Sequence, residues 1–281
     1  DHVWVFNKNG SGRRKQRPES ILKSNDLYTL NIKGTKDYRI ETKLADLEGQ
    51  YAKIVREKIK LHLPLTEYEH VILCFFVAAM MTRTLRHKQS IEKFYDELIE
   101  RAEEMETAHN APHTSSARWK REKENAHRLG VFQQLPNIAQ TLFQMSLMFA
   151  CTDGRGAKFI TNDDPVSMFN PELQWQRFYG PGLGQKSVEV SMPVTPEIKL
   201  FFTWRDVSGY VRLGGGVVQD SNRMLRAQTQ MFFVASSPHL NRLWFWRFPP
   251  NLGFIIKALF IEAKITVKNY WFRWNHYGRF R

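Results

Sequence analysis

Cysteine is nearly absent from this chain of 281 residues. The two cysteines, Cys74 and Cys151, lie in or next to apolar runs, and no Cys-x-x-Cys pair or Cys/His spacing typical of zinc is present. Two thiols in apolar surroundings are typical of buried cysteines in a reducing compartment. We therefore expect an intracellular protein of the cytoplasm or an organelle matrix.

Long apolar runs and common catalytic motifs are also missing. The longest apolar runs, Val71 to Met81 and Leu142 to Cys151, are shorter than the roughly 20 residues that a membrane span needs. Because these runs are so short, we expect no transmembrane segment. The first residues also show no secretory signal pattern. The sequence has no Walker loop, G-x-G-x-x-G, G-x-S-x-G or H-E-x-x-H motif, so none of these motifs names a reaction.

Positive charge is abundant and unevenly distributed. The 41 Lys and Arg residues exceed the 28 Asp and Glu residues, and the formal net charge is +13. Residues 1–60 carry +6 and residues 150–281 carry +8, whereas residues 61–149 carry −1. Basic regions at both ends suit a polyanion such as nucleic acid or an anionic membrane surface. The alternative is that the charge serves solubility alone.

Two segments concentrate the positive charge. Residues 13–17 form a basic run that is either a phosphate contact or a solvated loop. From Trp244 onward, aromatic and basic residues alternate, a pattern that can stack bases and hold phosphates. The same pattern fits a membrane-interface helix, or a tail that docks on this chain or on another subunit. The candidate nucleic-acid contacts are Arg13, Arg14, Lys15, Arg17, Arg247, Trp271, Arg273, Trp274 and Arg279.

Apolar periodicity predicts a helix-rich α+β fold, with a helical centre packed against a small mixed or antiparallel sheet. Thr66 and Glu69 form a capping box that begins the central buried helix. The other predicted helices cover residues 44–59, 91–105, 119–129 (ended by Gly130), 138–149 and 220–230 (capped by Asp220 or Ser221). The predicted strands are residues 3–6, 26–30, 158–160, 187–192, 199–204 and 232–235. We expect a domain over residues 1–237 and an aromatic, basic extension over 238–281.

An acidic turn is the sharpest candidate site. In Thr161–Val166, Pro165 directs Asp164 away from helical geometry and leaves two adjacent carboxylates after a short strand. Asp163 and Asp164, with Glu41 and Glu48, could supply oxygen ligands for Mg²⁺. Arg83 and Arg86 could then hold phosphate, and His87 could transfer protons.

A structural role is the competing interpretation for each of these residues. An aspartate before proline is common turn chemistry, and the two glutamates would share a helix face only if Glu41 is itself helical. Arg83 could equally form a structural ion pair with Glu41 or Asp163.

Several short segments, in order, resemble the DUF4238 family, whose members have no established reaction. They are Trp4–Lys8, Asn25–Tyr28, Ile40–Glu48, Arg83–Thr84, Thr161–Val166, Met192–Pro196, Asn222 and Phe232–Ser236. The resemblance covers about residues 3–237 and implies a shared fold. Family members usually open with a His-His-x-x-Pro-like motif before the first strand, which this sequence does not show, and the tail has no family counterpart.

Two functions follow as hypotheses. The first is a non-catalytic nucleic-acid-binding or ribonucleoprotein-associated subunit, with RNA favoured over DNA and protein partners bound through the extension. The alternative is a metal-dependent nuclease or toxin-like effector with Asp163, Asp164, Glu41 and Arg83 at its centre and Mg²⁺ as its cofactor.

Overall fold

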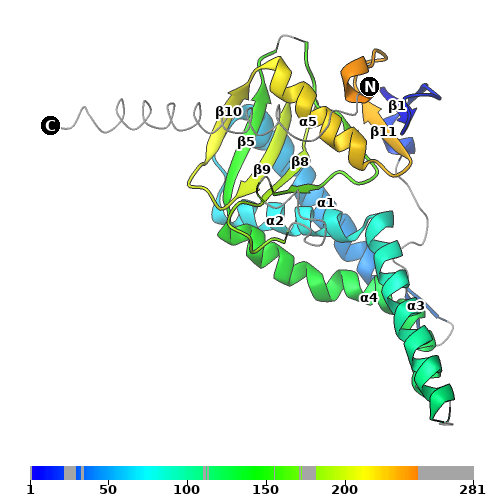
Figure 1. Ribbon diagram of the computed structural model, residues 1–281. Coiled ribbons are helices and arrows are strands. Elements are labelled where there is room, and N and C mark those ends of the chain that lie inside the picture. The colour runs from blue at the N-terminus through cyan, green and yellow to red at the C-terminus, as the bar shows by residue number, and fades with distance from the viewer. Residues whose placement is uncertain are drawn as a thin grey trace.

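A five-stranded sheet lies between two layers of helices (Figure 1). The computed structural model describes residues 2–21, 30–32, 35–109, 112, 114–154, 156–170, 172 and 182–245. In spatial order the strands are β10 (Gly209–Leu213), β5 (Ser146–Thr152), β9 (Ile198–Thr203), β8 (Glu189–Pro193) and β7 (Ser167–Phe169). β10 and β5 run parallel, and every other pair is antiparallel. The α+β class is therefore confirmed.

One face of this sheet forms the main core. Ile198, Leu200 and Phe202 alternate along β9 and face a helical layer of α1, α2 and the C-terminal part of α4. These helices are α1 (Arg39–Glu57), α2 (Glu67–Thr82) and α4 (Thr114–Gln144). The capping box at Thr66 is confirmed, because Thr66 Oγ1 accepts from Glu69 N while the Glu69 carboxylate accepts from Thr66 N. Buried Leu73 and Val77 make α2 the central helix, as its apolar sequence predicts.

The opposite face of the sheet is covered by α5 (Gly215–Gln228). Val218 of α5 packs on Ala150 of β5 and on Phe159. Helix α5 begins at Gly215, five residues before the predicted start at residue 220, and Gly214 is its N-cap instead of Asp220 or Ser221. Burial of Val218 against the sheet explains the earlier start, because it stabilises helical geometry before Asp220 and Ser221.

Helices α3 (Leu85–Ala108) and α4 pack along each other and extend away from the sheet as an arm (Figure 1). At the tip, the buried Glu106 carboxylate accepts hydrogen bonds from the backbone N–H groups of Ser115 (2.8 Å) and Ser116 (3.1 Å). A carboxylate at this position satisfies free N–H groups of the first turn of α4 and complements the helix dipole. Among the described residues no single helix passes the length and apolarity test for a membrane span; α2 and α3 pass only as a pair bent by 57°.

A second, four-stranded antiparallel sheet lies beside α5. Its order is β2 (Arg14–Gln16), β1 (Val3–Asn7), β11 (Phe232–Ala235) and β6 (Thr161–Asn162). Phe6 and Phe233 stack at 5.4 Å and pack with Leu225 of α5 and Trp244. Trp244 belongs to the short helix η3 (Arg242–Phe245), so the beginning of the expected extension packs on the domain. The remaining short elements are η1 (Pro18–Ser20), η2 (Ile59–Leu61), β3 (Leu30–Ile32) and β4 (Thr35–Asp37).

The structure corrects three of the predicted elements. The predicted helices at 119–129 and 138–149 are parts of one helix, α4, which continues through Gly130 and Pro136 and ends at Gln144. The apolar residues that follow form β5, because a central strand buried on both faces carries the same continuous apolar run as a buried helix. Residues 158–160 lie just before β6 and are not a strand. Their backbone is hydrogen-bonded to the side chain of Asn222 on α5. Most of the predicted 26–30 strand lies outside the described residues.

Candidate nucleic-acid interface and the acidic turn

Asp163 lies in the turn after β6 and binds the chain that enters β11. Its carboxylate accepts three backbone N–H bonds, from Gln230 (2.9 Å), Met231 (2.6 Å) and Phe232 (3.2 Å). Hydrogen bonds to a carboxylate are about twice as strong as neutral ones. This arrangement holds the connection between α5 and β11 in place and uses both oxygens that the metal hypothesis needs.

Asp164 has a different environment from its neighbour. It is buried, and its carboxylate lies 3.7 Å from the guanidinium of Arg86 on α3. Burial raises the pKa of Asp164, the Arg86 charge opposes that rise, and the Asp163 charge adds to it. The adjacent carboxylates therefore serve two separate contacts.

Side-chain amides complete the attachment of this segment to α5. Asn222 accepts a hydrogen bond from Ile160 N (3.1 Å) and donates one to the Lys158 carbonyl oxygen (2.7 Å), so it replaces a neighbouring strand. Buried Asn162 donates to the carbonyl oxygen of Leu225, and Gln228 donates to that of Asp164. The segment Thr161–Val166, one of those that carry the family resemblance, is thus a hydrogen-bonded connector between α5 and the two larger sheets.

Arg83 lies at the junction of α2 and α3 and pairs with Glu48 of α1 at 2.5 Å. Glu41 lies in the first turn of α1, so the condition for a shared helix face with Glu48 is met. Seven residues of helix separate these two glutamates by about 10 Å along the axis, and Glu48 is already paired with Arg83. Arg83 and Arg86 therefore tie the α2–α3 junction to α1 and to the acidic turn respectively.

The described residues include no group of three or more His, Cys, Asp or Glu side chains arranged to hold a metal ion. Around the acidic turn, Asp163 faces backbone N–H groups and Asp164 faces Arg86. The arrangement of these two residues suits a structural role better than Mg²⁺ binding.

The centre of the basic run at residues 13–17 is strand β2 (Arg14–Gln16) instead of part of a loop. Among the described residues β2 pairs with β1 alone, with Lys15 opposite Trp4 and Arg14 opposite Val5. Arg13, Arg14, Lys15 and Arg17 are all exposed. The Arg13 guanidinium lies 5.4 Å from the centre of the Trp4 ring. Because side chains alternate along a strand, positions 13, 15 and 17 point to the Trp4 side and position 14 points to the other.

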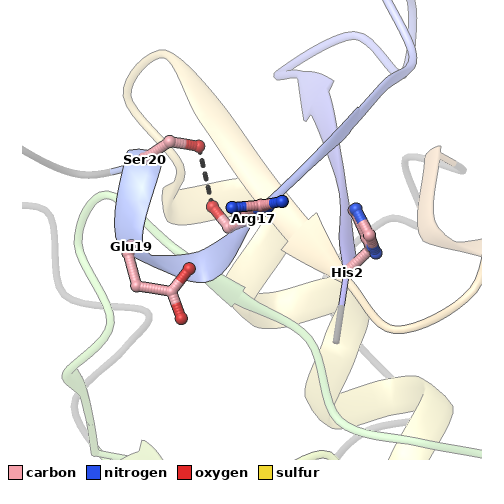
Figure 2. Close-up of a pocket in the computed structure, with 4 residues that line it drawn as sticks. All are labelled: His2, Arg17, Glu19 and Ser20. Carbon is pink, nitrogen blue, oxygen red and sulfur yellow. Dashed lines mark hydrogen bonds between the residues drawn. The ribbon is translucent and has the colours of Figure 1, made fainter.

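A surface pocket of about 550 Å³ adjoins the end of this strand. Figure 2 shows the four described residues that line it: His2 before β1, Arg17 after β2, and Glu19 and Ser20 of η1. Ser20 Oγ donates to the Arg17 carbonyl oxygen at 2.8 Å and fixes the bend of the chain. Arg17 is therefore shared between the basic strand and the pocket.

The other candidate contacts, Arg247, Trp271, Arg273, Trp274 and Arg279, lie outside the described residues.

Two side-chain pairs were not predicted from the sequence. Lys199 of β9 is 3% exposed and donates to Ser221 Oγ of α5 at 2.8 Å. Cys151 Sγ lies 3.7 Å from His62 Nε2, and His62 adopts a left-handed conformation with φ 56°. The signal for the first pair was a lysine within the apolar run Ile198–Phe202. The second joins residues 89 positions apart and carries no local signal.

The sequence profile of a family described as "Protein of unknown function (DUF4238)" matches residues 1–238. The chain belongs to the DUF4238 family. The match includes the five-stranded and four-stranded sheets, the described helices α1 to α5 and the acidic turn of this DUF4238 protein. Neither the curated proteins nor the solved structures searched contain a match to it.

Proposed function

We propose that this DUF4238 protein binds nucleic acid, RNA in preference to DNA, as a subunit of a ribonucleoprotein or similar assembly, and that it is non-catalytic toward the nucleic acid. The observation that carries the proposal is the row of exposed cations on and beside β2, which is an edge strand of the four-stranded sheet in the part of the chain that the structure describes. In the part of the chain that the structure describes, none of Arg13, Arg14, Lys15 and Arg17 forms an ion pair with a carboxylate. All four side chains are exposed, as phosphate contacts require.

The spacing of these cations suits an extended polyanion. Alternate residues of a strand repeat every 6.5–7 Å or so, which is close to the separation of successive phosphates in an extended single strand. The guanidinium of Arg13 lies over the Trp4 ring, and a guanidinium plane can stack on an unpaired base. Arg17 would extend the contact into the pocket, where Glu19 limits how much negative charge can enter.

Charged edge strands have another explanation, because lysines on an edge also prevent it from pairing with other chains. That role predicts aggregation when the charges are removed, and nucleic-acid binding predicts a loss of affinity. The two outcomes can be measured separately.

The nuclease alternative has less support. It requires carboxylate oxygens free for Mg²⁺, whereas the Asp163 oxygens accept three N–H bonds and Asp164 pairs with Arg86. Partner binding through residues 238–281 and residence in a reducing intracellular compartment complete the proposal. Two free, buried cysteines support the second point.

Fluorescence anisotropy with a labelled single-stranded RNA of about 20 nucleotides tests the proposal. A variant with Arg13, Arg14, Lys15 and Arg17 all changed to Gln should bind at least about tenfold more weakly at 50 mM salt. The matched control changes Lys88, Lys93, Arg118 and Lys120 to Gln, since it removes the same charge from the arm, where each cation pairs with a glutamate. Equal losses in both variants, or no binding by the unaltered protein, would reject a β2 interface.

A further inference from the structure

The sheet face beneath α5 carries buried polar side chains at several positions. Ser191, Lys199 and Thr203 lie on this face of β8 and β9, and Ser167 lies opposite Ser191 on β7. The opposite face at the same strands is apolar. A buried polar side chain must be hydrogen-bonded to offset its lost hydration, so this face differs from an ordinary sheet–helix interface.

Lys199 is the most unusual member of this set. Its ammonium nitrogen lies 2.8 Å from Ser221 Oγ and 5.3 Å from the centre of the Phe201 ring. Within the described chain, Ser221 is its one side-chain hydrogen-bond partner. Burial lowers the pKa of Lys199 to about 7, and the negative charge of Glu189 on β8 opposes this shift. Glu189 is itself 3.4 Å from Arg205, which weakens its effect on the lysine.

Ser221 is more accessible than its partner. It lies on α5 and is only partly buried, whereas Lys199 is beneath it. A partly exposed serine whose hydroxyl is bonded to a buried amine is the arrangement of a nucleophile and its base. The 2.8 Å separation is within the range for direct proton transfer.

We propose that Ser221 and Lys199 form a serine–lysine pair that accepts acyl groups from activated esters or thioesters. The neutral amine of Lys199 takes the hydroxyl proton as Ser221 Oγ attacks the acyl carbon. The bond to the leaving group then breaks, and the departing alcohol or thiol takes the proton from Lys199. Water, with its proton accepted by Lys199, hydrolyses the acyl-serine to a carboxylic acid and restores both side chains.

The position of Ser221 limits the substrate class. It lies in the interior of α5, where its backbone N–H belongs to the helix and does not stabilise the carbonyl oxygen. Donors with good leaving groups need the least such assistance, which is why activated esters and thioesters fit and ordinary amides do not.

Incubation of the full chain with p-nitrophenyl acetate, followed by peptide mass mapping, tests this pair. We expect one ester-linked acetyl group at Ser221, removable by hydroxylamine, and a burst of p-nitrophenolate of one equivalent. The acetylation rate should rise with pH through about 7 as Lys199 loses its proton. Failure to acetylate Ser221 in the unaltered protein would overturn the proposal, whatever the variants do.

Three variants separate chemistry from folding. Ser221→Ala should abolish the ester, and Lys199→Met, which keeps a long apolar stem, should slow its formation by about 100-fold or more. Ser90→Ala is the matched control, because Ser90 also lies within a helix but its hydroxyl donates to the backbone carbonyl of Arg86 and contacts no lysine in the described structure. Thermal melts establish that each variant is folded. Unchanged acetylation of Ser221 in folded Lys199→Met protein would also overturn the pair.

Discussion

The carboxylate of Asp163 accepts the backbone N–H of Met231 at 2.6 Å, although 68 residues separate them in the sequence. The same carboxylate accepts the N–H groups of Gln230 and Phe232. One side chain thus fixes three consecutive residues at the point where the chain enters strand β11, whose first residue, Phe232, pairs with Asn7 of β1. The acidic turn stabilises the junction of α5 with the four-stranded sheet.

Replacement of Asp163 should therefore reduce stability. Asp163→Ala removes an acceptor for three N–H groups, and we expect the free energy of unfolding to fall by about 2–4 kcal/mol. Asp163→Asn should also destabilise, because its amide NH₂ would face a backbone donor. Urea denaturation followed by circular dichroism measures both. A loss below about 0.5 kcal/mol for both variants would contradict the structural role.

Asn222 offers a second test of the connector. Asn222→Ala leaves Ile160 N and the Lys158 carbonyl oxygen without their partner at a position that is 1% exposed. We expect a loss of about 2–4 kcal/mol, since buried groups left unsatisfied cost 1–3 kcal/mol each. The exposed Asn137→Ala on α4 is the control and should change stability by under about 0.5 kcal/mol. Similar losses in the two variants would argue against the connector.

Local sequence signals predicted much of the fold but little of the site. The capping box at Thr66 and the strand Phe232–Ala235 are both present at the predicted residues, because each depends on neighbours in sequence. The prediction of two helices in place of α4 was wrong, because tertiary packing can keep a helix continuous through a glycine such as Gly130 and a proline such as Pro136. The roles of Asp163 and Asn222 depend on partners more than 60 residues away, and no local pattern reports such a distance.

Histidine burial predicts how stability depends on pH. His70 of α2 packs between Phe143 and Phe202, and burial lowers its pKa, as it does for His87. The unfolded chain then binds protons more readily than the folded one, so stability is lost as pH falls from about 6.5 through the lower folded pKa. His70→Phe should weaken this dependence in urea melts between pH 7.5 and 5, and the exposed His239→Gln should not. An unchanged slope in His70→Phe would contradict the prediction.

Gly130 tests the continuity of α4. A Cβ at this position would meet Ile91 Cδ1 at 3.4 Å, and the flexible end of that side chain can move to accommodate it. Alanine is favoured over glycine in a helix interior by about 0.8–1.0 kcal/mol. We therefore expect Gly130→Ala to raise stability by about 0.5–1 kcal/mol, measured by urea denaturation. A clear loss would mean that α3 and α4 pack too closely here for any side chain.

The salt dependence of RNA binding tests the central proposal most directly. Each phosphate neutralised on a single strand contributes about −0.7 to the slope of log K against log salt. Titrations of a labelled single-stranded RNA from 50 to 200 mM salt should give a slope shallower by about 3 when Arg13, Arg14, Lys15 and Arg17 are all Gln. The control that removes four cations from the α3–α4 arm should keep the original slope. Equal slopes for the β2 variant and the unaltered protein would contradict the claim that this edge strand binds phosphates.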